Sequence, residues 1–559
     1  MAETHVEVSV MFRALVAGLV FGVLAGAPAM AQANEADIAR AAQLFPSTLP
    51  LKERHAKVMQ YASGQLGTAE EQRAAGFALV GLCNDDQYGP SCLQVGHSFI
   101  SLGEAYDASA YNYFDKACGL GEGEGCSERA ILELDGYAGN APQPQKALAG
   151  FLKGCELNNG PACQHAGWSY REGSGAAQDF TAARGVYEKG CRLDAAEACF
   201  YSGFYKRLGR GGPEDNAGAW QDYVKGCDLG NASACNNLGV MQEHGVSRPA
   251  DLAGALASYA KACEGGNKNA CNNAGIFAHY GKGGPVDLAK AEANYRKSCE
   301  LDYAEGCYNQ ALMSWNSKTD LPAARQAAEK ACRTEHVAAC NLAGVMQLNG
   351  EGGPKDVASA LVNYEFACGK NEGIACSNLG AVNYSGLEGN PVNYPAALSY
   401  YTKSCDLNYA EGCRSLGLAH ENGMGQTPDP VKAYQAFQKA CTLGSPNGCH
   451  KQGFSLYTGA GVVSDPQAAL VAYGKGCDLK VGASCYNLGL MAYFGQAGAI
   501  DKAKGRDYYR QACELGEAGG CERYGWALRD GEGGASDAAG AAAALAKACS
   551  LGRASACTQ

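Results

Sequence analysis

The sequence predicts an all-α protein, a right-handed α/α solenoid of about 13–14 helix–turn–helix repeats of about 36 residues, each stapled by a disulfide. Two observations predict this fold class. All 28 cysteines fall into fourteen couples that recur about every 36 residues, and the same helix-start and helix-stop residues surround the couples. A fixed period of roughly 20 to 50 residues is typical of stacked-repeat proteins, in which each unit contacts only its neighbours.

An apolar stretch near the N-terminus predicts export. Leu15–Gly26 is uncharged, and small residues around Ala31 and Ala33 form a cleavage pattern, so we expect residues 1–31 to be a signal peptide. The acidic first ten residues do not suit such a segment, and Met11 is the better start. A membrane anchor is the alternative, but the apolar core falls short of the roughly 20 residues that span a bilayer. We therefore expect a periplasmic or secreted protein without stable membrane insertion after cleavage.

Domain organisation follows from where the repeats begin. Residues 34–67 are expected to form one or two N-terminal capping helices, interrupted by Pro46 and Pro50, and residues 68–559 to form the solenoid. One repeat, between the couple that ends at Cys307 and the couple that begins at Cys332, is three residues short and lacks a glycine turn.

The cysteine couples predict disulfides, because an even, paired count in an exported chain is typical of a disulfide framework. Thirteen couples have seven intervening residues and the first has eight. Zinc is the alternative, but structural zinc sites favour shorter spacings, and the nine histidines keep no fixed offset from the cysteines. Cysteines eight apart on one helix would lie about 12 Å apart, too far for a disulfide, so the chain must turn between them. The couples expected to pair are Cys83 with Cys92, Cys118 with Cys126, Cys155 with Cys163, Cys191 with Cys199, Cys227 with Cys235, Cys263 with Cys271, Cys299 with Cys307, Cys332 with Cys340, Cys368 with Cys376, Cys405 with Cys413, Cys441 with Cys449, Cys477 with Cys485, Cys513 with Cys521 and Cys549 with Cys557.

A helix, termed helix B, is predicted to end at the first cysteine of each couple. Aspartate or asparagine, both N-cap residues, stands twelve residues before that cysteine in eleven repeats. An aromatic residue stands four before it in eleven couples, and a lysine two before it in eleven, near the C-terminus where the helix dipole favours a cation. The predicted caps are Asp179, Asp215, Asp251, Asp287, Asp320, Asp356, Asn393, Asp429, Asp465, Asp501 and Asp537.

A second helix, termed helix A, is predicted to start around the second cysteine and to end in a glycine-rich turn such as Gly281–Asp287. Glycine recurs four residues after the second cysteine. Because glycine inside a helix costs about 1 kcal/mol relative to alanine, its return predicts the close approach of a neighbouring helix. These glycines are Gly96, Gly167, Gly203, Gly239, Gly275, Gly344, Gly380, Gly417, Gly453, Gly489 and Gly525.

The run from Cys235 to Cys263 resembles the Sel-one-like repeat, a relative of the tetratricopeptide repeat. With the cysteine couples added, residues 68 to 557 are similar to the secreted helical cysteine-rich proteins of bacteria. The resemblance implies penicillin binding and weak β-lactamase activity, which would require serine β-lactamase motifs. The one S-x-x-K is Ser258–Lys261, whose lysine is the repeat lysine, and S-D-N and K-T-G are absent. The sequence thus favours a protein that is not an enzyme.

Other chemistry is not indicated. No C-x-x-C or H-E-x-x-H motif occurs, so we expect no redox-active cysteines, no metal and no cofactor. The net charge is −11 and basic residues do not cluster, which argues against nucleic acid as a partner.

Asparagine recurs two residues after the second cysteine, inside helix A, at Asn237, Asn273, Asn309, Asn378 and Asn487. Asparagine is a mediocre helix former, so its return suggests a use. It either hydrogen-bonds the backbone of an extended peptide on the concave face or links repeat to repeat. We therefore predict an exported scaffold that binds proteins or peptides. The alternative is a β-lactamase-like hydrolase or a penicillin- or peptidoglycan-binding protein, with β-lactams or peptidoglycan fragments as its partners.

Overall fold

The computed structural model describes residues 35–387 and 389–557. The predicted signal peptide, residues 1–31, lies outside these described residues. Within them every regular element is helical, and the one β-bridge, between Leu387 and Asn390, is isolated. None of the described helices is long and apolar enough to cross a membrane.

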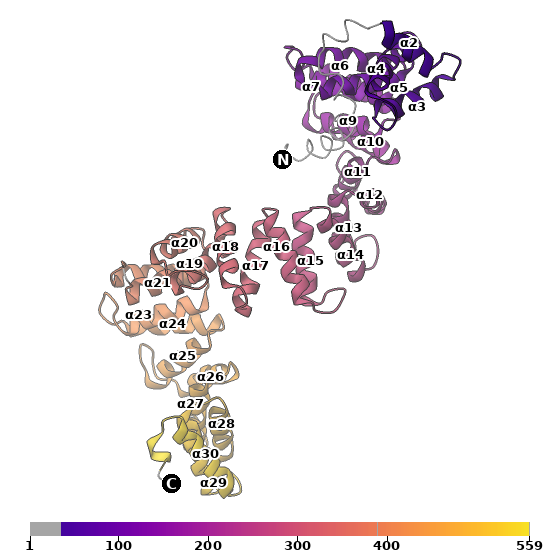
Figure 1. Cartoon of the computed structure of the whole chain (residues 1–559). Coiled ribbons are helices and arrows are strands. Elements are labelled where there is room, and N and C mark those ends of the chain that lie inside the picture. The colour runs from indigo at the N-terminus through magenta and orange to yellow at the C-terminus, as the bar shows by residue number, and fades with distance from the viewer. Residues whose placement is uncertain (1–34, 388, 558–559) are drawn as a thin grey trace. The chain divides into compact units, whose positions relative to one another are not determined.

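The chain divides into two compact units, with the boundary between Asn294 and Tyr295 inside α16 (Leu288–Glu300). Figure 1 shows the helices in chain order along each unit. The first unit contains α2 (Glu35–Leu44), α3 (Leu51–Ala62), α4 (Ala69–Asn84), α5 (Gly89–Ser101), η2 (Glu104–Tyr106), α6 (Asp107–Gly119), α7 (Gly123–Asp135), α8 (Pro144–Glu156), α9 (Gly160–Glu172), α10 (Phe180–Arg192), α11 (Ala196–Leu208), α12 (Asn216–Asp228), α13 (Ala232–His244), α14 (Leu252–Glu264) and α15 (Lys268–Tyr280).

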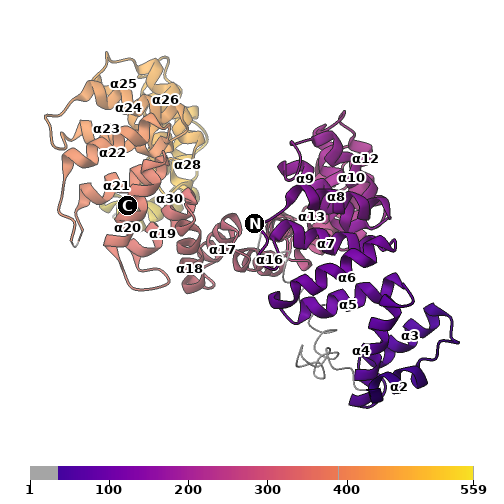
Figure 2. The same ribbon diagram turned by 90° about the horizontal axis from the view of Figure 1, so that it is seen from above.

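The second unit continues the same alternation, which Figure 2 shows from above. It contains α17 (Ala304–Ser317), α18 (Leu321–Arg333), α19 (Val337–Asn349), α20 (Val357–Gly369), α21 (Gly373–Ser385), α22 (Tyr394–Asp406), α23 (Ala410–Glu421), α24 (Pro430–Thr442), α25 (Pro446–Thr458), α26 (Pro466–Asp478), α27 (Gly482–Phe494), α28 (Lys502–Glu514), α29 (Ala518–Arg529), α30 (Ala538–Ser550) and η3 (Ala554–Ala556). From α4 onward the even-numbered helices are B helices and the odd-numbered ones are A helices.

The predicted helix B is confirmed together with its caps. In all eleven repeats the aspartate or asparagine accepts a hydrogen bond from a backbone N–H in the first turn, as Asp215 does from Gly218 at 2.8 Å. Each of these helices runs one residue past its cysteine. Helix A begins three residues before the second cysteine, earlier than predicted, because residues such as Asn231 and Asn267 cap it there.

Fourteen disulfides close the predicted couples, from Cys83 with Cys92 to Cys549 with Cys557, and no described cysteine is free. The bridged Cα atoms lie 4.3 to 4.9 Å apart. The first thirteen bridges join the C-terminus of a B helix to the first turn of the next A helix, and the last joins α30 to the residue after η3. Each loop of about nine residues contributes roughly 2.5 kcal/mol in the chain-entropy model, so the disulfides brace the connections between successive A–B hairpins.

The recurrent glycines confirm the predicted close approach and identify the neighbour. A Cβ atom on Gly239 of α13 would lie 2.7 Å from Cε1 of Tyr259, on the B helix that follows. The ring of the B-helix aromatic therefore rests directly on the A-helix backbone. The same contact joins Gly96 with Phe114, Gly167 with Tyr187, Gly203 with Tyr223, Gly344 with Tyr364, Gly380 with Tyr401, Gly417 with Phe437, Gly453 with Tyr473 and Gly489 with Tyr509, and Leu545 lies against Gly525 in the last hairpin.

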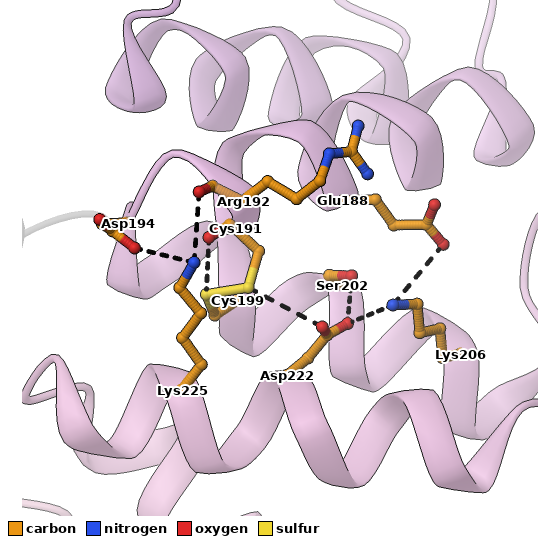
Figure 3. The surroundings of a disulfide bond; sticks show 9 residues. All are labelled: Glu188, Cys191, Arg192, Asp194, Cys199, Ser202, Lys206, Asp222 and Lys225. Carbon is orange, nitrogen blue, oxygen red and sulfur yellow. Dashed lines mark hydrogen bonds and ion pairs between the residues drawn. A yellow bond between two sulfur atoms is a disulfide. The ribbon is translucent and has the colours of Figure 1, made fainter.

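The lysine two residues before the first cysteine lies in the last turn of its own helix, as predicted, and also reaches the preceding repeat. Lys225 of α12 donates to the carbonyl of Arg192 at 3.2 Å and pairs with Asp194 at 2.8 Å (Figure 3). Arg192 ends α10, the preceding B helix. Lys330 reaches the carbonyl of Cys299 in the same way, at 2.6 Å. The cation therefore also neutralises the dipole of the neighbouring B helix and ties two repeats together.

The glycine-rich turns set the spacing between repeats. Gly211 has φ 69°, and a Cβ there would collide with the carbonyl oxygen of Phe180, the first residue of the preceding B helix. Gly352 has φ 74° and lies in the same way against Leu321. The short repeat lacks this turn as predicted. There α17 ends at Ser317, and its C-cap residue Lys318 takes φ 56°, lies over Trp315 and pairs with Glu351.

The glycine contact makes a first prediction. Gly239→Ala should destabilise the α13–α14 hairpin by about 1–3 kcal/mol, because the added methyl overpacks against the Tyr259 ring. Hydrogen exchange followed by mass spectrometry measures this locally. Gly185→Ala is the matched control: that glycine lies inside α10, and an added methyl would have nothing within 4 Å, so alanine should stabilise the helix by about 0.5–1 kcal/mol. Equal protection in both variants would contradict the packing role.

The disulfide pattern makes a second prediction. Non-reducing peptide mapping of the oxidised protein should recover all fourteen neighbouring pairs and essentially no free thiol, because the bridged cysteines meet within each connection. Thiol titration of the denatured, unreduced chain is the control. Several cross-paired couples, or free thiols in protein taken from its native compartment, would contradict the bracing role.

Candidate binding face on the A helices

Consecutive A helices lie next to one another within each unit. In the first unit α7, α9, α11 and α13 follow in contact, and in the second α17 contacts α19, α21 contacts α23, and α27 contacts α29. Side-chain contacts show which positions adjoin. Arg171 of α9 lies over the ring of Tyr201 of α11 at 4.8 Å, and Arg523 of α29 lies over Phe494 of α27 at 5.9 Å. The residues two, five and eight or nine positions after the second cysteine therefore share one surface, termed the A face.

The aromatic residues divide between the two kinds of helix. All eleven aromatics that stand four residues before a first cysteine, on the B helices, are buried. Among the described residues seven aromatic side chains are exposed, and six of these belong to A helices. The six are Trp168, Tyr280, Tyr384, Phe454, Tyr457 and Phe494. The core thus takes most of its aromatics from the B helices, although Tyr205 of α11 and Phe277 of α15 are also buried, and most of the exposed aromatics lie on A helices.

The exposed aromatics are closest in sequence toward the end of the second unit. Phe454 and Tyr457 lie on α25 and Phe494, 48 % exposed, on α27. Arg523 of α29 lies over Phe494 and over Trp526, at 5.9 and 5.3 Å. These five residues are termed the C-terminal aromatic row. An arginine held over rings beside exposed aromatic surface combines the residue types that are enriched at protein interfaces.

The predicted asparagines lie half-buried on the A face and already bond within the chain. Asn237 donates to the hydroxyl of Tyr223 at 3.2 Å. Burial raises the pKa of Tyr223 to about 12, and the hydrogen bond from Asn237 opposes that shift, so the phenol stays neutral. Asn487 makes the corresponding contact with Tyr473, as the effect on the pKa of that phenol indicates. Asn309 lies half-buried at the same position on α17.

Two of the asparagines reach from repeat to repeat. Asn273 donates to Oδ1 of Asn236 in the preceding repeat at 3.3 Å, and Asn378 donates to Asn341 in the same way at 2.9 Å. Both acceptors stand one residue after the second cysteine, where asparagine is not a regular feature of the sequence. These bonds stiffen the stack, and a contact from the five asparagines to a ligand stays a prediction.

Ser258, the serine of the one S-x-x-K sequence, is not arranged as an activated nucleophile. It is buried in α14 and its hydroxyl donates to Oε1 of Gln242 at 2.7 Å. Lys261 pairs with Asp228 at 3.5 Å. An amide oxygen is not a general base, so the geometry offers this serine no route to deprotonation.

Among the described residues, one trio of potential metal ligands comes together: His97 of α5 with Glu124 and Glu128 of α7. Sequence motifs did not reveal it, because the ligands come from two helices. The exposed aromatics were also missed, since an aromatic in an amphipathic helix is equally compatible with a place in the core.

The repeats match a known family model. The model of the Sel1 repeat matches residues 232–267, 268–303, 336–371, 373–409, 410–445 and 482–517. Each matched segment spans an A helix and the B helix after it, so each disulfide lies at a junction between repeats. No curated protein matches the chain.

Several solved structures are similar to this chain, and the first of them shows the same fold. A protective antigen of uropathogenic Escherichia coli strains, which displays an SLR fold, is 20 % identical over 85 % of this chain and 93 % of that chain, with a TM-score of 0.54. A Sel1 repeat protein from Oxalobacter formigenes is 20 % identical over 61 % of this chain and 90 % of its own, with a TM-score of 0.39. Cysteine-rich protein B of Helicobacter pylori is 36 % identical over 23 % of this chain and 93 % of its own, with a TM-score of 0.20. With six units that match the repeat model and helices paired throughout as A–B hairpins, the chain belongs to the Sel1 repeat family.

Proposed function

We propose that this protein is an exported scaffold that binds protein segments on its A face, with exposed aromatic residues as anchors. The observation that carries the proposal is the distribution of aromatics: the eleven that stand four residues before a first cysteine on the B helices are all buried, whereas six of the seven exposed aromatics among the described residues lie on A helices. Aromatic side chains supply large contact areas and dominate interface energetics. Six aromatics that stay accessible on the A helices are available as anchors for a partner.

The stiffness of the stack supports the same function. Every junction between repeats carries a disulfide, and lysines such as Lys225 and Lys330 bridge successive B helices. A surface held in one shape before binding loses less conformational entropy when a partner docks. The bracing thus favours recognition by a preformed face over folding around the ligand.

Export is supported by the cysteine chemistry. Fourteen disulfides require an oxidising compartment, such as the periplasm or the extracellular medium. The predicted signal peptide, cut near Ala31 or Ala33, would deliver the chain there. Fractionation of the native host with N-terminal sequencing of the mature protein tests this part, and a reduced cytoplasmic pool with an intact N-terminus would contradict it.

The C-terminal aromatic row makes a testable prediction. Peptides selected on the mature protein from a phage-displayed random library should bind the double variant Phe454→Ala with Phe494→Ala at least about 30-fold more weakly, since losing a hot-spot aromatic costs roughly 2 kcal/mol or more. Fluorescence anisotropy measures the affinities. Because both side chains are exposed, hydrogen-exchange protection should stay unchanged.

Val362→Ala is the matched control for that experiment, because Val362 is an exposed apolar residue of the B helix α20 in the same unit. Selected peptides should bind this variant normally. Equal affinity for wild type and the double variant, or selection of peptides that respond only to Val362, would place binding elsewhere than on the A face.

The asparagines make a separate prediction. Asn378→Ala should lower the protection of α19 and α21 by about 0.5–1.5 kcal/mol, the worth of the lost bond to Asn341. Asn316→Ala, exposed on α17, controls for the higher helix propensity of alanine. If the asparagines instead bind a ligand, the variant keeps its protection and loses affinity for the selected peptides. That outcome would contradict the repeat-to-repeat role.

A further inference from the structure

One A-face position breaks its own pattern near the start of the repeats. The residue five positions after the second cysteine is apolar in twelve of the thirteen A helices, for example Leu312 and Leu490. In α5 this residue is His97. The adjacent A helix, α7, carries Glu128 at the position where five other repeats have asparagine. A histidine at an otherwise apolar position, next to glutamates of the adjacent helix, needs a chemical explanation.

The three side chains converge from two helices. Glu124 and Glu128 are four residues apart and therefore point from the same side of α7. Nε2 of His97 lies 3.6 Å from Oε1 of Glu124, and ligand atoms of all three residues lie within 4.8 Å of one another. The His97 ring packs edge-on against Phe114, with centroids 5.3 Å apart, which restrains its orientation. The His97 and Glu124 side chains are 30 % and 49 % exposed, so an ion reaches them from solvent.

These distances suit a tetrahedral zinc ion. Zinc bonds to histidine nitrogen and carboxylate oxygen are about 2.0–2.2 Å long, which places two ligands of one ion roughly 3.3 Å apart. The observed 3.6 Å between His97 and Glu124 is close to that separation. A rotation about the side-chain bonds of Glu128 brings the third ligand in. An imidazole among the donors favours zinc over calcium or magnesium, which take oxygen ligands alone.

We propose that His97, Glu124 and Glu128 form a zinc site that links α5 to α7. Three protein ligands leave a fourth position of the tetrahedron open toward solvent on the A face. Water fills that position in the free protein, and a carboxylate or imidazole of a bound partner is able to replace it. The site is independent of the C-terminal aromatic row, which lies in the other unit.

The alternative is an ion pair between an imidazolium and Glu124, without a metal. Arg129, the nearest cation along α7, is engaged by Asp115 at 2.6 Å and by Glu133 at 3.5 Å. The two interpretations differ in one measurable property, the uptake of a divalent metal ion.

The test is zinc titration of the full mature chain, oxidised, free of any histidine tag and dialysed against a chelator. Competition with a chromophoric chelator should show one zinc ion bound per chain. Cobalt(II) in its place should give visible d–d bands without a thiolate charge-transfer band, because every described cysteine is in a disulfide. His97→Leu and Glu128→Gln should each weaken zinc binding at least about tenfold, since loss of a supporting outer-shell group alone costs that much.

The controls separate loss of a ligand from loss of fold. His97→Leu installs the residue type that other repeats carry at this position, and its circular dichroism should match wild type. His244→Ala removes an exposed histidine of α13 and should leave zinc affinity unchanged. Absence of zinc uptake by wild type, or equal uptake by wild type, His97→Leu and Glu128→Gln, would overturn the site and leave the ion pair.

Discussion

The contact between an aromatic ring on most B helices and a glycine on the preceding A helix underlies the rest of the structure. In the hairpin of α13 and α14, the ring of Tyr259 occupies the space where a Cβ of Gly239 would lie. This close approach brings the two helices together without a large core, which a 36-residue unit does not have. Glycine inside a helix is unfavourable by about 1 kcal/mol, and burial of a whole aromatic side chain more than offsets that loss.

Because the rings point into the hairpins, the A helices turn their other side to solvent. The connections between hairpins are braced separately. The disulfides link B helices to the A helices that follow them, and the lysines link successive B helices. Lys225, for example, reaches the C-terminus of α10 as well as Asp194. These braces lie away from the A face. Because the bracing residues lie elsewhere, the residues on the A face differ from repeat to repeat. Phe494 is exposed in one repeat, for example, and His97 lies beside Glu124 in another.

The variation along the A face suggests that function in this protein resides in departures from the repeat. Asn273 and Asn378 use their amides to join neighbouring repeats, so two of the recurrent asparagines serve the stack. The exposed aromatics and the trio around His97 occur once or a few times each. A ligand that spans several repeats contacts such irregular positions selectively, because the regular ones present the same surface everywhere.

The sequence by itself determined the helices, their caps and the cysteine pairing. These features are local: Asp215 caps a helix that starts one residue later, and Cys227 meets Cys235 across a single turn. Only the tertiary structure decided which neighbour a repeated residue meets. The lysine before each first cysteine fits either its own helix end or the preceding one, and an aromatic on an amphipathic helix fits core or surface equally well. In a periodic sequence these alternative contacts are present at every repeat. Which contact forms depends on how successive hairpins stack, and that stacking brings together residues about 30 positions apart.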